Sequence, residues 1–257
     1  MTLFLVLGFA RRADADTEAW YRGKYGRNRI VHLSITLGLG AIWVGTGSVY
    51  KSTFGSPACR WCDPPGFDRS ARDALLWNDT DRAKTYSNVS AYVLSPIVGV
   101  SLLVASDHDA GTARLIDDLL PIAETVVITQ LLNRFIRYAV QRERPPDHFG
   151  TSGRDPAEDL NPSFPSGHTT FGFAITTSAG MIAHWRHYKT EPYIWAAGIT
   201  MSVATGYLRV AADQHYVSDV FVGALVGAGA GLLVPRLMRR DLQLVPVKDG
   251  AAVVGRF

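Results

Sequence analysis

Cysteine is scarce in this sequence, with only Cys59 and Cys62 among 257 residues. Two thiols are too few for the disulfide frameworks of small secreted domains and too few for a four-thiolate zinc site. Packing must therefore hold the fold together. The C-x-x-C spacing without a surrounding βαβ pattern favours a small structural disulfide over a redox motif. Such a disulfide would place its loop in an oxidising compartment.

Blocks of one charge sign are also missing. Lys and Arg number 26 and Asp and Glu number 23, which leaves a net charge of +3 spread along the chain. A nucleic-acid binder concentrates its basic residues on one face or in runs, so we expect no nucleic-acid partner. With 47% hydrophobic residues and no low-complexity linker, the sequence excludes a disordered chain and predicts one domain.

The positions where charge is absent indicate the fold class. Five long stretches contain no Asp, Glu, Lys or Arg: residues 30–50, 85–106, 169–185, 192–208 and 220–235. Each approaches or reaches the roughly 20 residues that a helix needs to cross the hydrocarbon of a bilayer. Gly, Ala, Ser and Thr occupy positions where a soluble amphipathic helix would carry charges. In the last stretch, Gly223, Gly227 and Gly231 have the small-xxx-small spacing of closely packed membrane helices.

A sixth stretch, residues 115–135, carries Asp117, Asp118 and Glu124 and is a weaker candidate by hydropathy alone. We interpret the first two acids as part of an interfacial first turn near a helix N-terminus rather than as an ion pathway. Glu124 has no explanation at this level. Together the six stretches predict an all-α fold, a bundle of six transmembrane helices. A soluble helical protein is the alternative, and the charge-free stretches speak against it.

The domain organisation follows from these stretches. Residues 1–29 form an N-terminal lead, residues 30–235 a membrane-embedded domain, and residues 236–257 a C-terminal tail. The apolar start resembles a signal peptide at residues 1–15, but no basic residue precedes it, so an uncleaved cytoplasmic lead stays open. The tail predicts either a β-hairpin around an Asp-Gly pair or a disordered end.

Three short clusters carry residues suited to phosphate chemistry. In the first, Arg137 and Arg144 are seven residues apart, and Pro145 follows. On a helix the two arginines would share one face, and Pro145 would end that helix. Two guanidiniums aimed at one point suit a phosphate. A basic stop after a membrane helix is the alternative interpretation.

The second cluster is Ser166-Gly167-His168, which follows a proline just before the fourth apolar stretch. Backbone N–H groups at the start of a helix attract an anion. The alternative is a helix-capping serine beside a chance histidine, which accounts for Ser166 but does not require His168.

The third cluster contains Arg209, His215 and Asp219. His215 and Asp219 are one helical turn apart, a spacing at which the carboxylate can accept the imidazole N–H and leave the other nitrogen as a nucleophile. A loop histidine beside an interfacial aspartate is the alternative. With six crossings, the connections that carry the three clusters lie on one side of the membrane. The clusters can therefore converge on one interfacial pocket.

Together these clusters resemble the signature of the type 2 phosphatidic acid phosphatase superfamily. These histidine phosphatases include membrane lipid phosphatases, bacterial acid phosphatases and vanadium haloperoxidases. The signature reads K-x6-R-P, then P-S-G-H, then S-R-x5-H-x3-D, and the resemblance extends over about residues 30–235. Arg137 stands where the signature has Lys, and Leu208 where it has Ser. Arg in place of Lys keeps the cation, so phosphate binding should survive with altered geometry.

The resemblance implies a phosphohistidine mechanism. His215 would attack the phosphorus with Asp219 orienting it, and His168 would protonate the leaving oxygen and later activate water. Guanidiniums, a hydroxyl and a backbone amide would hold the nonbridging oxygens: Arg137, Arg144, Arg209, Ser166 and Gly167. Phosphoryl transfer needs neutralised charge and in-line placement, and three fixed guanidiniums can supply the charge. The resemblance implies no metal and no other cofactor.

The sequence therefore predicts a membrane-bound, metal-independent phosphatase that acts on a lipid phosphate or a polyprenyl diphosphate. Its partners would be that lipid and the bilayer. A lipid phosphotransferase using the same histidine and a vanadate-dependent peroxidase are the alternatives. A non-catalytic binding protein is disfavoured because both histidines and Asp219 are present. Loop Lys and Arg favour a cytoplasmic N-terminus, so we expect a bacterial inner-membrane protein with its active site facing the periplasm or outside.

Overall fold

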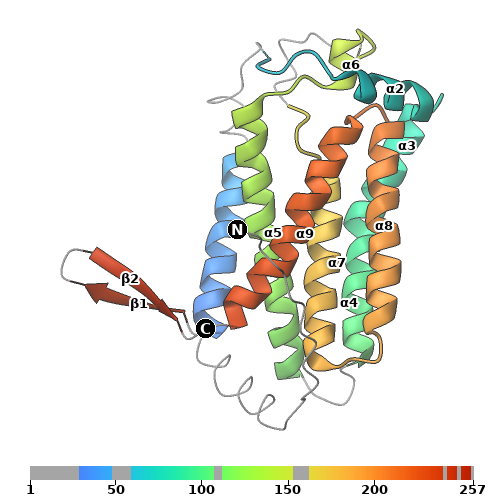
Figure 1. The fold of residues 1–257 in the computed structure, drawn as a ribbon. Coiled ribbons are helices and arrows are strands. Elements are labelled where there is room, and N and C mark those ends of the chain that lie inside the picture. Colours follow the sequence, from blue (N-terminus) through green and yellow to red (C-terminus); the bar gives the residue numbers. More distant parts are fainter. Residues whose placement is uncertain are drawn as a thin grey trace, which may run out of the picture.

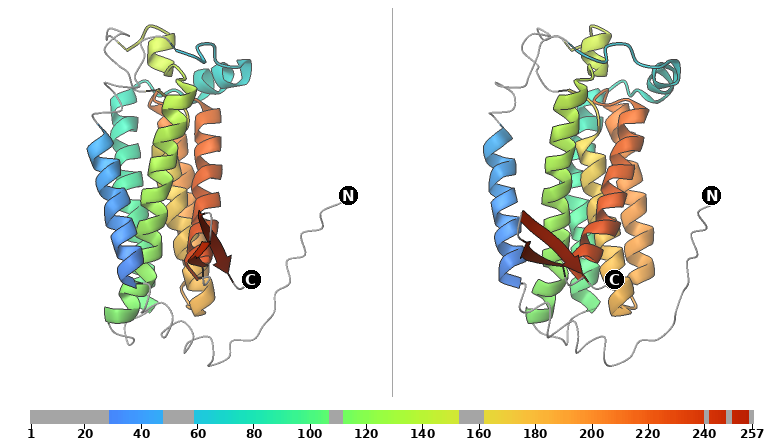
Figure 2. Two further views of the ribbon diagram at one scale, coloured as in Figure 1. Left: turned by 90° about the vertical axis from the view of Figure 1, so that its left-hand side faces the viewer. Right: turned by 60° about the vertical axis from the view of Figure 1, so that its left-hand side comes forward.

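A computed structural model describes residues 29–47, 59–106, 112–152, 162–239, 242–247 and 250–255. The signal peptide predicted at residues 1–15 lies outside the described residues. Long helices standing side by side form the body of the protein, and two short helices, α2 (Gly66–Leu75) and α6 (Pro145–His148), cap one end (Figures 1 and 2). We refer to this end as the capped end.

Six long helical segments make up the described bundle. They are the helix Arg29–Gly47, then α3 (Thr80–Val89) continued by η1 (Ser90–Leu94) and α4 (Ser95–Ser106), α5 (Thr112–Val140), α7 (Gly167–Arg186), α8 (Glu191–Ala211) and α9 (Val217–Arg239). The predicted hairpin in the tail is confirmed, because β1 (Leu242–Val247) pairs antiparallel with β2 (Gly250–Gly255). The all-α fold class is confirmed for the rest of the described chain.

The outer faces of the bundle are apolar. Within the described residues, three segments are long and apolar enough to cross a membrane: Arg29–Gly47, Thr80–Ala105 and Val217–Met238. Large hydrophobic side chains such as Val44, Ile97 and Phe221 are more than half exposed on these three segments. Water would disfavour such surfaces and lipid would not, as expected for an integral membrane protein. The number of six crossings stays a prediction.

The centre of the bundle is α7, which packs against α9, α8, α5 and α4. Fourteen of its 20 residues are buried, and most of them are small. The predicted close packing of the α9 glycines is confirmed, because a Cβ on Gly223, Gly227 or Gly231 would collide with α7. Small residues let the backbones of α7 and α9 approach closely, and this packing fixes the two helices against each other.

Asp117 and Asp118 lie further along their helix than predicted, because α5 begins at Thr112 and places both beyond its first turn. All three acids of the sixth stretch contact a basic side chain: Asp117 with Arg29 (2.6 Å), Asp118 with Arg186 (2.7 Å) and Glu124 with His32 (3.0 Å). The partner that the sequence did not reveal for Glu124 is therefore the helix Arg29–Gly47.

The first arginine cluster has a different backbone from the one expected. Helix α5 ends at Val140, and Gln141 adopts a positive φ of 48°. Arg144 is the extended residue that precedes α6, and Pro145 begins that helix instead of ending the previous one. The prediction that Arg137 and Arg144 share one helix face was wrong, because the left-handed turn at Gln141 redirects the chain and proline suits a first helical position.

Candidate active site

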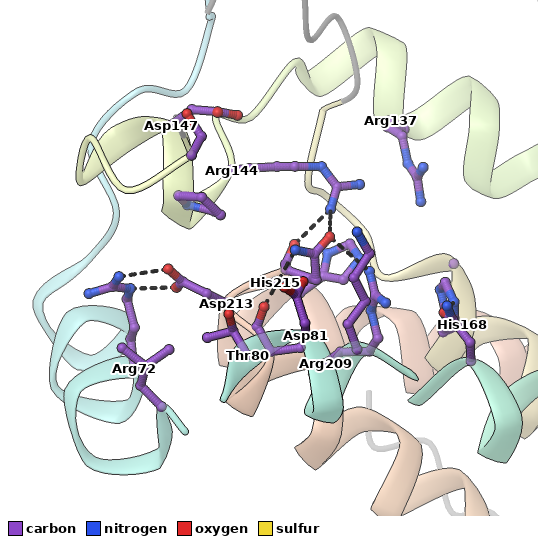
Figure 3. A pocket seen from close by; sticks show the side chains of 18 of the residues that line it. Arg72, Thr80, Asp81, Arg137, Arg144, Asp147, His168, Arg209, Asp213 and His215 are labelled. Atoms are coloured by element: carbon purple, nitrogen blue, oxygen red, sulfur yellow. Dashed lines mark hydrogen bonds and ion pairs between the residues drawn. The ribbon is translucent and has the colours of Figure 1, made fainter. Parts of the chain in front are cut away.

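A cavity of about 1080 Å³ opens at the capped end of the bundle. Six of the eight residues predicted for catalysis or phosphate binding line it: Arg137, Arg144, Gly167, His168, Arg209 and His215. Figure 3 shows the three arginines and two histidines arranged around this space. They come from α5, the segment before α6, α7, α8 and the loop before α9, so residues up to 78 positions apart in the sequence converge on one cavity.

Each of the three arginines has a fixed anchor. Arg137 donates from Nη2 to the carbonyl oxygen of Pro165 at 3.3 Å. Arg144 donates from Nη1 to the carbonyl oxygen of Gln214 at 2.9 Å, and Arg209 from Nη1 to Oγ of Ser87 at 3.2 Å. These contacts hold the guanidiniums in place around the cavity, which suits recognition of a multiply charged anion such as a phosphate.

His215 lies in the short loop between α8 and α9 and is buried. Its Nδ1 lies 3.4 Å from Oδ2 of Asp219, so the predicted pair meets, although the alignment falls short of a hydrogen bond. Burial, followed by the nearby charges of Arg144 and Arg209, lowers the pKa of His215 well below its usual range. The imidazole is therefore neutral near pH 7 and retains the lone pair that a nucleophile needs.

His168 is the second residue of α7 and faces α3. Its Nε2 lies 2.8 Å from Oδ1 of Asn88, and its ring centroid lies 4.7 Å from that of Tyr92. Both partners are one turn apart on the helix that leads into α4. They were missed by the sequence analysis, since nothing in that stretch indicates which residues would face a histidine 80 positions away.

Ser166 and Asp219 do not line the cavity. Both are fully buried behind its wall. The hydroxyl of Ser166 lies 3.0 Å from Oγ1 of Thr169, and its backbone N–H donates to the carbonyl oxygen of Asp219 at 2.9 Å. Ser166 thus links the starts of α7 and α9, and its hydroxyl contacts Thr169 instead of lining the cavity.

A buried ion pair supports the loop that carries His215. Arg72 of α2 donates to both oxygens of Asp213, at 2.6 and 2.7 Å. This hydrogen-bonded pairing raises the pKa of Arg72 above its usual range. Asp213 has a positive φ of 57°, which Asp tolerates better than most residues. The sequence analysis missed this pair because its members are 141 residues apart.

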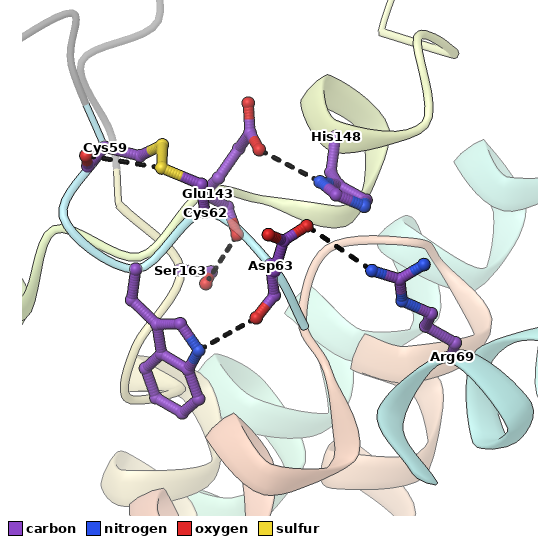
Figure 4. Close-up of a disulfide and its surroundings, with 8 residues drawn as sticks. Cys59, Cys62, Asp63, Arg69, Glu143, His148 and Ser163 are labelled. Carbon is purple, nitrogen blue, oxygen red and sulfur yellow. Dashed lines mark hydrogen bonds and ion pairs between the residues drawn. A yellow bond between two sulfur atoms is a disulfide. The ribbon is translucent and has the colours of Figure 1, made fainter. Parts of the chain in front are cut away.

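The two cysteines lie outside the cavity, in the segment before α2. A disulfide joins Cys59 and Cys62, with their Cα atoms 5.4 Å apart. Figure 4 shows this loop beside Glu143, which contacts His148 of α6. The loop is held against the start of the Arg144 segment, since the N–H of Glu143 donates to the carbonyl oxygen of Trp61 at 3.2 Å.

Residues 118–242 match the model of the PAP2 superfamily. These residues belong to the PAP2 superfamily. All three clusters lie within them, whereas α2 and α3, which contribute Arg72 and Asn88 to the site, precede them.

The chain is also similar to individual proteins. Over 71 residues it is 38% identical to a lipid A 1-phosphatase of Porphyromonas gingivalis, a match that covers 28% of this chain and 15% of that protein. The structure of LpxE from Aquifex aeolicus is similar over 66% of this chain and 93% of its own, with 22% identity and a TM-score of 0.45. A transmembrane PAP2-type phosphatidylglycerolphosphate phosphatase from Bacillus subtilis is similar over 81% and 94%, with 17% identity and a TM-score of 0.45.

Proposed function

We propose that this protein is a membrane-bound phosphatase that removes phosphate from a lipid phosphate or polyprenyl diphosphate through a phosphohistidine intermediate. The observation that carries the proposal is the convergence of three guanidiniums and a neutral, buried His215 on one cavity. A phosphoryl group needs charge neutralisation on its oxygens and a nucleophile in line with the leaving group. The three guanidiniums would supply the charge and His215 the nucleophile, and the match of residues 118–242 to the PAP2 superfamily supports this reading.

The reaction would run in two steps. In the first, Nε2 of His215 attacks phosphorus, the bond from phosphorus to the lipid oxygen breaks, and protonated His168 gives that oxygen a proton. Burial and the charges of the three cavity arginines lower the pKa of His168 to about 2 in the free protein. His168 would therefore take up this proton together with the phosphate, whose negative charge offsets the guanidiniums. In the second step, His168 takes a proton from water, whose oxygen attacks phosphorus and releases phosphate and free His215. Asp219, 3.4 Å from Nδ1, would orient the imidazole in both steps and stabilise its positive charge.

Arg137, Arg144, Arg209 and the backbone amide of Gly167 would hold the nonbridging oxygens. Gly167 is the first residue of α7, where backbone N–H groups are free of intrahelical partners. A Cβ at this position would come within 3.0 Å of Nη2 of Arg137, so glycine lets this guanidinium approach the helix start closely. Arg137 would in this way perform the role that the signature gives to Lys.

A lipid substrate fits the position of the cavity. It lies at the end of an apolar bundle, and residues of the membrane-facing segments, Trp43 and Tyr92 among them, line it together with the charged groups. A phosphate could enter the cavity while its hydrocarbon chain stays in the bilayer. The disulfide beside the cavity further supports a site that faces an oxidising compartment, outside the inner membrane of a bacterium.

The test is phosphate release from phosphatidate, phosphatidylglycerophosphate, a polyprenyl diphosphate and lipid A by detergent-purified protein in EDTA. We expect release by the wild type and none by His215→Gln. His148→Gln is the matched control, because His148 contacts Glu143 and does not line the cavity. Acid-labile radiolabel trapped on the wild type and absent from His215→Gln would identify the intermediate. Release by His215→Gln at the wild-type rate would overturn the proposal.

A further inference from the structure

Arg142 stands between the two arginines of the first cluster but faces the opposite way. It is 1% exposed, and it does not line the cavity that Arg137 and Arg144 share. Its Nη1 donates to Oδ1 of Asp219 at 2.5 Å, and its Nη2 donates to Oδ2 of Asp68 at 2.7 Å. A single buried guanidinium thus links two carboxylates, one of which is the partner of His215.

The surroundings of Arg142 leave it little freedom. Its guanidinium lies 3.9 Å from the ring centroid of Trp61 and 4.2 Å from that of Tyr216. Cation–π contacts of this kind favour a desolvated guanidinium. The backbone on either side is also fixed, because the N–H of Arg60 donates to the carbonyl oxygen of Gln141 at 3.0 Å. The loop closed by the disulfide and the turn after α5 therefore hold Arg142 in place together.

Asp68 completes the arrangement from α2. Its oxygens accept from the backbone N–H and the hydroxyl of Ser218, at 3.0 and 2.6 Å, besides the bond from Arg142. Ser218 immediately precedes Asp219, and its hydroxyl also accepts from Nη1 of Arg142 at 2.6 Å. Asp68 and Arg142 thus bind the start of α9 to α2, and neither side chain lines the cavity.

This arrangement determines which oxygen of Asp219 meets His215. Oδ1 is occupied by Arg142, while Oδ2 accepts the N–H of Tyr216 at 3.0 Å and lies nearest to Nδ1 of His215. Removing the guanidinium would leave two buried carboxylates close together without a cation, a costly state that favours rearrangement. Asp219 would then lose the contact that fixes its orientation.

We propose that Arg142 is a positioning residue: together with Asp68 it holds Asp219 so that one carboxylate oxygen faces His215 during attack on the phosphate. The inference rests on the proposed function. It assigns Arg142 no contact with substrate, in contrast to the other arginines of the cluster. Loss of Arg142 therefore lowers the rate of the chemical step and leaves substrate binding nearly unchanged.

The experiment is a double-mutant cycle with Arg142→Met and Asp219→Asn, using the lipid phosphate that the wild type cleaves fastest in the panel above. We expect Arg142→Met to lower kcat by about 100-fold and to change KM by less than about threefold. In the Asp219→Asn background, Arg142→Met should lower kcat by less than about threefold, because the two substitutions remove the same function. A purely structural role would instead give the full loss in both backgrounds.

Two further variants make the result specific. Arg142→Lys should recover part of kcat, because its ammonium keeps the positive charge but lacks the planar fork that bonds the two carboxylates in a fixed geometry. Arg69→Met is the matched control: Arg69 is an exposed arginine of α2 whose side chain reaches Asp63 and Pro64. Its kcat should equal that of the wild type. Should Arg142→Met fail to yield a monodisperse protein, Arg142→Lys and Asp68→Asn should show the same selective loss of kcat.

The outcomes separate the two proposals. An active wild type with an unchanged kcat in Arg142→Met, or with fully additive losses in the cycle, overturns the positioning role alone. A wild type that releases phosphate from no lipid overturns the proposed function and this inference with it. A loss in KM larger than the loss in kcat would make Arg142 a binding residue and would likewise overturn the inference.

Discussion

The close approach of α9 to the start of α7 predicts a strong effect of one added methyl group. In Gly223→Ala, the new Cβ would lie 2.7 Å from the carbonyl oxygen of Ser166 and 3.1 Å from Oγ1 of Thr170. The Ser166 carbonyl would have to retreat by roughly 0.7 Å to restore ordinary van der Waals contact. Overpacking of this kind costs about 1–3 kcal/mol in stability.

The displacement would reach the chemistry because Ser166 directly precedes Gly167 and His168. The backbone N–H of Ser166 also donates to the carbonyl oxygen of Asp219 at 2.9 Å. Since a misplacement of about 1 Å can cost 100-fold in rate, we expect Gly223→Ala to lower kcat by about tenfold or more. Gly229→Ala is the matched control on the same helix, because a Cβ there meets nothing within 4 Å.

The assay compares the wild type and both variants in one detergent, by thermal unfolding and by phosphate release from the preferred lipid. The control should be at least as stable as the wild type, because Ala favours a helix over Gly by about 0.5–1 kcal/mol. Gly223→Ala should unfold at a lower temperature than both. A Gly223→Ala protein as stable and as active as the control would refute the packing argument.

Three shorter predictions address single side chains. Arg137→Lys restores the residue of the family signature and should keep kcat/KM within about tenfold of the wild type. Arg137→Ala should lower kcat/KM by about 100-fold or more. Equal losses in the two variants would contradict a purely cationic role of Arg137. Asn88→Ala should lower kcat about tenfold, because His168 loses the side chain that orients it. An unchanged kcat would show that His168 does not need Asn88. In nitrogen-15 spectra at pH 5.5, about one unit below the usual histidine pKa, His215 should still be neutral because its pKa is lowered, and a protonated ring would contradict this.

The helices of the bundle were predictable because lipid imposes a simple rule on sequence. A segment that crosses a bilayer excludes charge over about 20 residues, and that absence is visible without any partner. Helix ends follow weaker rules. The end of α5 depends on the left-handed turn at Gln141, a residue that carries no strong signal for that conformation. The sequence therefore located the helix but extended it past its end to Pro145.

The cavity was predictable in part for a different reason. An even number of crossings between the clusters predicts that all three lie on one side of the membrane, and the family signature singles out their residues. Side chains from α2 and α3 have no such signal, since they reach the site through contacts across the fold. Ser87 meets Arg209 over 122 positions, and Arg72 meets Asp213 over 141. Residue spacing in a single sequence predicts contacts only between nearby positions, so it does not predict these pairs.

Arg142 shows why residue type and spacing alone do not assign a role. The first cluster contains three arginines within eight residues, and any two of them could be aimed at a phosphate. The turn at Gln141 and the stacking of Trp61 on Arg142 decide which one is withdrawn into the protein. Because Asp68 and Asp219 are both fully buried there, the site needs a cation that no substrate can displace. The cluster therefore divides its charge: two guanidiniums line the cavity, and the third bonds to Asp219, the carboxylate beside His215.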